Sequence, residues 1–172
     1  MRYAAALILL AAVLPATAHA EVVKAEAGGF SVSYKLNIAA PPAKVWAALI
    51  RPARWWSSDH TYSGSAANLT LDPRAGGCWC ETLKDGIVEH MRVVFIQQDQ
   101  RLRLAGGLGP LQSLAVSGAM EFALKPTGTG TELTVTYTVG GWMPGGLDKL
   151  AASVDAVFGA QVANLKRVAE AG

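Results

Sequence analysis

The C-terminal part of the chain carries one apolar stripe, and this stripe restricts the fold more than any other feature. Its members recur at helical spacing, at Leu147, Leu150, Val154, Phe158, Val162, Leu165 and Val168. Such spacing predicts a long amphipathic helix with one face that must be buried. The only partner large enough is a sheet formed by the preceding residues, so we expect an α+β domain in which this helix packs on the sheet.

The residues before this helix predict that sheet. Alternation from Phe30 to Ile38 is typical of a strand with one buried face. From Asn68 onward, apolar runs separated by turn residues predict further strands, at 69–71, 78–83, 87–96, 101–105, 114–124 and 132–139. Because short turns join consecutive strands, we expect the sheet to be antiparallel.

Two short helices are predicted between the first strand and the rest of the sheet. Pro41 and Pro42 precede apolar residues at helical spacing, and proline is well tolerated in a first helical turn. Pro52 ends this helix and begins a second one that carries Trp55 and Trp56. The whole order predicts a helix-grip fold, a curved antiparallel sheet of about six to seven strands around the C-terminal helix. The space between sheet and helix is the natural cavity.

Residues 1–20 have the parts of a secretory signal peptide. Arg2 is followed by an apolar run and by the small-x-small sequence Ala18-His19-Ala20, the usual order of such a leader. The run is shorter than the roughly 20 residues that span a bilayer. We expect cleavage after Ala20, a single domain over 21–172, and a periplasmic or secreted protein; a retained N-terminal anchor is the alternative.

Charge and motifs exclude several function classes. Removal of Arg2 with the leader leaves 14 basic side chains against 13 acidic ones, and no basic block interleaved with aromatics indicates nucleic acid. No later segment is long and apolar enough to cross a membrane. The glycine-rich stretches 106–109 and 128–130 do not lie between a parallel strand and a helix, as phosphate loops do. The sequence indicates no cofactor.

Several motifs, in order and spacing, resemble the START/Bet v1-like superfamily. They are Pro-Pro-Ala-Lys-Val-Trp-Ala-Ala-Leu at 41–49, Arg-Trp-Trp at 54–56 and Arg-Ala-Gly-Gly at 74–77. Within it, the chain is most similar to the activator-of-Hsp90-ATPase-like and polyketide-cyclase-like branch, over about 30–168. The resemblance implies binding of lipids, sterols or polyketides, with cyclisation or dehydration in a minority of members. The leader departs from cytosolic co-chaperones and indicates an exported subgroup, so no Hsp90 role is carried over.

Cys78 and Cys80 are the only cysteines, and the oxidising compartments that receive exported proteins normally convert cysteines into disulfides. In an ideal strand, residues i and i+2 lie about 6.6 Å apart with parallel side chains, whereas an unstrained disulfide needs Cβ atoms about 3.8 Å apart. We therefore favour two reduced cysteines that line the cavity. A strained redox-active disulfide and a metal site with His60 and His90 remain open.

The turn at 84–86 decides which residue faces His90. A three-residue turn places Cys80 opposite His90, and a two-residue turn places Glu81 there, as a charge-assisted pair. His60 lies in the polar loop 57–67 beside Asp59. His60, Glu81 and His90 are therefore the acid–base candidates, although spacing alone assembles no catalytic set, and whether the protein is an enzyme stays open.

The leading hypothesis is an exported protein that binds a hydrophobic or amphipathic small molecule between sheet and helix. A polyketide-cyclase-like enzyme and a metal or redox protein are the alternatives. The expected ligand-binding residues come from segments that should flank the cavity, and they are Trp56, His60, Cys78, Cys80, His90, Trp142, Val154 and Phe158.

Overall fold

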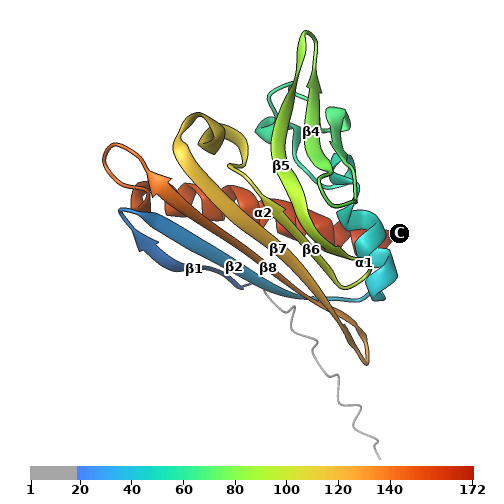
Figure 1. The fold of residues 1–172 in the computed structure, drawn as a ribbon. Coiled ribbons are helices and arrows are strands. Elements are labelled where there is room, and N and C mark those ends of the chain that lie inside the picture. Colours follow the sequence, from blue (N-terminus) through green and yellow to red (C-terminus); the bar gives the residue numbers. More distant parts are fainter. Residues whose placement is uncertain (1–18) are drawn as a thin grey trace, which may run out of the picture.

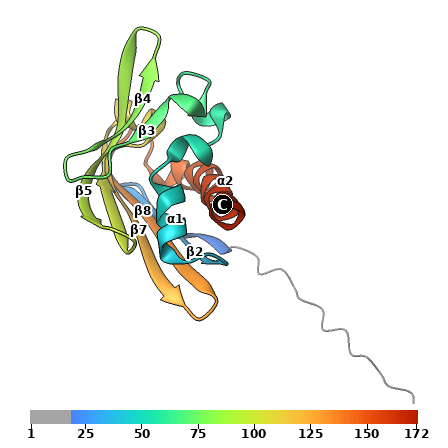
Figure 2. The ribbon, with the colours of Figure 1, turned by 90° about the vertical axis from the view of Figure 1, so that its right-hand side faces the viewer.

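The computed structural model describes residues 19–172 as a curved sheet with a long helix against one face (Figures 1 and 2). All neighbouring strands are antiparallel, in the order β1-β2-β8-β7-β6-β5-β4-β3. The strands are β1 (His19–Glu26), β2 (Gly29–Ile38), β3 (Leu69–Leu71), β4 (Cys78–Leu83), β5 (Gly86–Gln97), β6 (Arg101–Ala105), β7 (Ala115–Thr127) and β8 (Gly130–Trp142). The long helix is α2 (Asp148–Ala171). The predicted helix-grip fold is confirmed.

The connection between β2 and β3 runs along the same side of the sheet as α2 (Figure 2). It contains the helix α1 (Pro42–Leu49) and three single 3₁₀ turns, η1 (Pro52–Arg54), η2 (Ser58–His60) and η3 (Ala66–Asn68). A fourth turn, η4 (Gly109–Ser113), lies between β6 and β7. The second predicted helix is therefore only η1, and the two tryptophans that follow it are buried in the core.

The sheet has one strand more than expected. The additional strand, β1, begins at His19 and pairs with β2, so the predicted cleavage point after Ala20 falls inside it. The sequence analysis assigned the first two residues of β1 to the leader and predicted no strand there. The rest of the predicted leader, residues 1–18, lies outside the described part of the chain.

Helix α2 is held closely at its C-terminal half and less closely at its N-terminal half. Phe158, Val162 and Leu165 are fully buried against the sheet, whereas Leu150 and Val154 are only partly buried. The apolar stripe therefore performs two tasks: its later residues close the core, and its earlier residues leave a space between helix and sheet. Within residues 19–172, neither α2 nor the shorter helices are long and apolar enough to span a bilayer.

Several polar contacts hold α2 in place, and two of them lie at its middle. The Tyr34 hydroxyl on β2 donates to the Asp155 carboxylate at 2.8 Å. The side-chain oxygen of Gln161, which is buried, accepts from the Ser57 backbone N–H at 2.7 Å. Because Gln161 is polar yet buried, its bond ties the helix to the loop that follows η1.

The glycine pair before β4 is required by the backbone. Gly76 has φ +77°, a conformation that glycine adopts at little cost. A side chain on Gly77 would overlap the carbonyl oxygen of Asp72. The Arg-Ala-Gly-Gly motif thus makes the tight entry into β4, which carries both cysteines.

Candidate functional site

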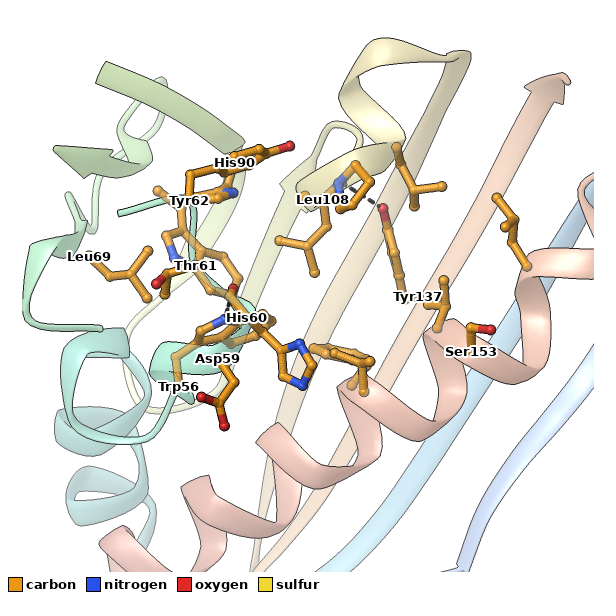
Figure 3. Close-up of a pocket in the computed structure, with 18 residues that line it drawn as sticks. Trp56, Asp59, His60, Thr61, Tyr62, Leu69, His90, Leu108, Tyr137 and Ser153 are labelled. Carbon is orange, nitrogen blue, oxygen red and sulfur yellow. Dashed lines mark hydrogen bonds between the residues drawn. The ribbon is translucent and has the colours of Figure 1, made fainter. Parts of the chain in front are cut away.

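A cavity of about 400 Å³ lies between the N-terminal half of α2 and the sheet (Figure 3). Its walls are mainly apolar: α2 contributes Leu150, Val154, Val157 and Phe158, and the segment at η4 contributes Leu108 and Leu111. The loop around η2 supplies residues 59–62, and the sheet supplies Trp79, His90 and Tyr137. This volume and this lining are typical of a small-molecule site, which is concave and apolar with a few polar groups.

The cavity contains only some of the residues expected to bind ligand. Five of the eight line it: Trp56, His60, His90, Val154 and Phe158. The other three, Cys78, Cys80 and Trp142, do not. Trp142 lies at the end of β8, and its side chain is 69% exposed. Its segment was expected to flank the cavity, but at the end of β8 it does not line it.

The two cysteines form a disulfide, so the interpretation as free, cavity-lining thiols is corrected. Their Cα atoms lie 5.4 Å apart, within the usual disulfide range and closer than in an ideal strand. The ideal-strand estimate placed them too far apart, and the β4–β5 pairing shifts register beside them, between Trp79 and Cys80. Trp79 lines the cavity, and alternation along β4 places its two cysteine neighbours on the opposite face.

This geometry also separates the proposed metal ligands. The cysteine sulfurs bond to each other on the outer face, whereas His60 and His90 line the cavity on the inner face. Figure 3 shows the two histidines well apart, with His90 beside Tyr62. No cluster of three or more metal-ligating side chains occurs within residues 19–172. Of the three interpretations of the cysteine pair, the disulfide is the one that the structure adopts.

A β-bulge places His90 inside the molecule. Trp79 pairs with Met91 and Cys80 pairs with Glu89, so His90 is the extra residue on β5. Because a bulge interrupts the alternation of side chains, His90 and Met91 are both buried although they are adjacent. The hairpin has a two-residue turn in which Leu83 pairs with Gly86. Both expected partners of His90 were therefore wrong as register partners, since the bulge was not anticipated.

His90 nevertheless contacts Glu81 through its side chain. The His90 Nε2 atom lies 2.9 Å from Glu81 Oε2, and both side chains are buried. The same oxygen accepts from the Tyr62 backbone N–H at 3.1 Å, and the other carboxylate oxygen accepts from the Ser63 N–H. Glu81 is fully buried, so these hydrogen bonds replace the hydration that its carboxylate would have in water. They fasten the loop after η2 to the β4–β5 hairpin.

Glu81 is ionised in this environment. Burial alone raises the pKa of the Glu81 carboxyl, but the hydrogen bonds from residues 62 and 63 and from His90 outweigh burial and lower that pKa. An ionised carboxylate only accepts hydrogen bonds, so His90 Nε2 is the donor of the pair. In the neutral imidazole ring the lone pair then belongs to Nδ1.

Two residues that line the cavity each have a buried polar atom without a hydrogen-bond partner within residues 19–172. His90 Nδ1 and Trp79 Nε1 are buried, and neither has a hydrogen-bond partner within residues 19–172. The two neighbouring tryptophans differ, because Trp55 donates to the Leu49 carbonyl and Trp56 donates to the His60 carbonyl. Buried polar groups normally form hydrogen bonds, so these two atoms are exceptions among the buried side chains within residues 19–172.

The Tyr137 hydroxyl in the wall is already hydrogen-bonded. The Tyr137 hydroxyl accepts from the Leu108 backbone N–H at 3.0 Å and donates to the Gly106 carbonyl at 3.4 Å. Burial raises the pKa of Tyr137 to about 12, so this hydroxyl stays protonated. The His60 side chain is exposed at the edge of the cavity. Among the buried side-chain atoms within residues 19–172, those without a hydrogen-bond partner are thus Trp79 Nε1 and His90 Nδ1.

Several cavity residues escaped prediction, namely Tyr62, Trp79, Leu108 and Tyr137. For Trp79 the signal was present, because alternation places it opposite the cysteines and hence on the cavity face. For Tyr62 and Leu108 there was none, since loop residues reach the cavity only through the tertiary fold. The Tyr62 ring stacks on His90, with ring centroids 6.0 Å apart.

Comparisons with solved structures give the same fold. A protein from Rhizobium leguminosarum is 21% identical, with 91% of this chain and 99% of that chain covered and a TM-score of 0.62. A protein from Mesorhizobium loti is 20% identical, with coverages of 80% and 95% and a TM-score of 0.59. CalU16 from Micromonospora echinospora is 16% identical, with coverages of 89% and 85% and a TM-score of 0.58. No curated protein matches the sequence significantly.

The sequence itself matches one family model, described as polyketide cyclase / dehydrase and lipid transport, over residues 29–170. The match begins at β2 and ends near the C-terminus of α2, so it includes every element that lines the cavity. The expected superfamily is confirmed, and the chain belongs to the polyketide cyclase / dehydrase and lipid transport family.

Proposed function

We propose that this protein binds a hydrophobic or amphipathic small molecule in the cavity between the sheet and α2. The observation that carries the proposal is the cavity of about 400 Å³ with mainly apolar walls. An apolar stripe on α2 that serves only the core would be buried along its whole length. Here Leu150 and Val154 instead face open space, where an apolar ligand would cover them.

The proposal includes export. Its support is the leader-like composition of residues 1–20 and the disulfide, because disulfides persist mainly in oxidising compartments. An exported binding protein of this kind would carry a poorly soluble molecule outside the cytoplasm. Protein partners are not part of the proposal.

The test is to fill the cavity from α2. Val154→Trp places a large ring in the cavity, and Ala156→Trp adds the same ring at an exposed position of the same helix. After incubation with extracted lipids, native mass spectrometry should show a bound molecule on the wild type and on Ala156→Trp but not on Val154→Trp. Equal loading of both variants, or none on the wild type, would overturn the proposal.

A second candidate function is acid–base catalysis, and the Glu81–His90 pair favours it. A carboxylate that orients an imidazole ring is a recurrent arrangement of general bases, and here the ring lines the cavity. His60 also lines the cavity, although the two histidines lie apart. An enzyme would convert its bound compound, so mass spectrometry of the ligand before and after incubation separates the two functions.

A further inference from the structure

We infer that the cavity accepts uncharged ligands and excludes anionic ones, such as a fatty acid or any other apolar molecule that ends in a carboxylate. This inference rests on the proposed ligand binding and names the charge class of the ligand. It follows from the charged groups at the wall. One carboxylate belongs to the lining, a second one contacts a lining histidine, and no lysine or arginine occurs among the lining residues within the described chain 19–172.

The first argument is the rim of the cavity. A headgroup that extends out of the cavity would lie among the exposed lining residues, which are Asp59, His60, Tyr62, Pro110 and Ser153. The Asp59 carboxylate accepts a hydrogen bond from the Ser57 hydroxyl at 3.4 Å, a neutral partner that leaves its negative charge in place. Because like charges repel, an anionic headgroup at this rim is disfavoured.

The second argument is the interior. His90 lines the cavity, and its Nε2 atom lies 2.9 Å from the ionised carboxylate of Glu81. The other hydrogen bonds of Glu81 come from backbone N–H groups, which stabilise the carboxylate but carry no net charge. Even a proton on both His60 and His90 would only balance the carboxylates of Asp59 and Glu81. These four groups therefore give the wall no net positive charge.

The third argument concerns the lysine that precedes a lining residue of α2. Lys149 comes directly before Leu150, but its Nζ atom lies 3.1 Å from the position that a Cβ atom on Gly145 would occupy, and Lys149 is not part of the lining. A carboxylate that enters the mainly apolar cavity would lose its hydration without gaining a cationic partner, which is costly. An uncharged group avoids most of this cost.

The experiment compares two probes with the same chain length, 1-octanol and octanoate. At pH 7 octanoate is ionised, because aliphatic carboxyl groups have pKa values of about 4 to 5. Dissociation constants are measured by calorimetry for the wild type, Asp59→Asn, Ser153→Lys and Ala156→Lys. The last two variants each add one lysine at an exposed position of α2, but only Ser153 lines the cavity. Only binding that Val154→Trp abolishes is counted as binding in the cavity.

The readout is the ratio of the two dissociation constants within each protein, which does not depend on how much of a variant is folded. We expect the wild type to bind 1-octanol roughly 100-fold more tightly than octanoate, because octanoate loses its hydration without a cationic partner. Ser153→Lys should reduce this ratio about fivefold, the upper range for an ion pair between exposed groups. Asp59→Asn should reduce the ratio as well, and Ala156→Lys should leave it unchanged.

A wild type that binds octanoate as tightly as 1-octanol would overturn this inference and leave the proposed function intact. Equal ratios in Ser153→Lys and Ala156→Lys would also overturn it, since a lysine at the wall would then have no effect of its own on anion binding. Binding of neither probe in the cavity would refute the proposed function together with this inference.

Discussion

Replacement of Glu81 by glutamine tests the central claim about the site, that a buried carboxylate joins the loop after η2 to the β4–β5 hairpin. The carboxylate accepts from the backbone of Tyr62 and from His90 with one oxygen, and from the backbone of Ser63 with the other. Glutamine has one oxygen and one NH₂ group. In either orientation its NH₂ group meets a backbone N–H, so one buried donor always loses its acceptor.

The expected cost follows from that mismatch. A hydrogen bond to a charged group contributes roughly 1.5–3 kcal/mol, and a buried unsatisfied donor costs about 1–3 kcal/mol. The two values describe partly the same loss and are not simply added. We therefore expect Glu81→Gln to lower the free energy of unfolding by about 3 kcal/mol at pH 7. The matched control is Glu89→Gln on β5, whose carboxylate pairs with Arg92 at the surface. Such exposed pairs contribute about 0–1 kcal/mol.

The assay is equilibrium unfolding in urea, with hydrogen exchange of the Tyr62 and Ser63 amides as a local readout. The pH dependence gives a second check. Because the pKa of Glu81 is lowered in the folded protein, its contribution is complete above about pH 4.3, the ordinary value for glutamate, and is lost as the pH falls through the lowered value. The wild type and Glu81→Gln should therefore converge in acid. Equal stability of the two at pH 7, or a constant difference down to low pH, would refute the reasoning.

Two further predictions concern the residues that lie outside the cavity. The disulfide closes a loop with one intervening residue, so its replacement by Cys78→Ser with Cys80→Ser should cost only about 1.5 kcal/mol. Loading with extracted lipid should stay unchanged in that variant, as native mass spectrometry can show; a large loss would mean that the bridge supports the cavity. Trp142→Ala should leave loading with extracted lipid unchanged as well, because Trp142 is exposed and does not line the cavity. Weaker binding by Trp142→Ala would contradict this placement and indicate that Trp142 contributes to the cavity entrance.

Much of the fold was accessible from local patterns. The alternation from Phe30 to Ile38 corresponds to β2, and the apolar stripe from Leu147 corresponds to α2. The predictions succeeded because each pattern reports one buried face, and a buried face is a local property of the sequence. Val154 and Phe158 were placed at the cavity for the same reason, since they belong to the stripe.

The site was less accessible because it depends on pairing between strands. Alternation in β5 predicts either His90 or Met91 inside, and the bulge turns both inward. The same register shift lies at the cysteine pair, where an ideal strand made the disulfide seem unfavourable. A bulge adds one residue to one strand, and the sequence of β5 alone carries no signal that predicts it.

The sequence by itself determined the elements, their order, the helix-grip architecture and the apolar character of the cavity, because side-chain periodicity encodes which faces are buried. Only the tertiary structure decided that the cysteines bond to each other on the outer face, that His90 meets Glu81, and that Trp79 Nε1 and His90 Nδ1 are buried without hydrogen-bond partners within residues 19–172. These outcomes depend on the register of the β4–β5 hairpin and on how loops and neighbouring side chains pack around it, and both are fixed only in the folded sheet.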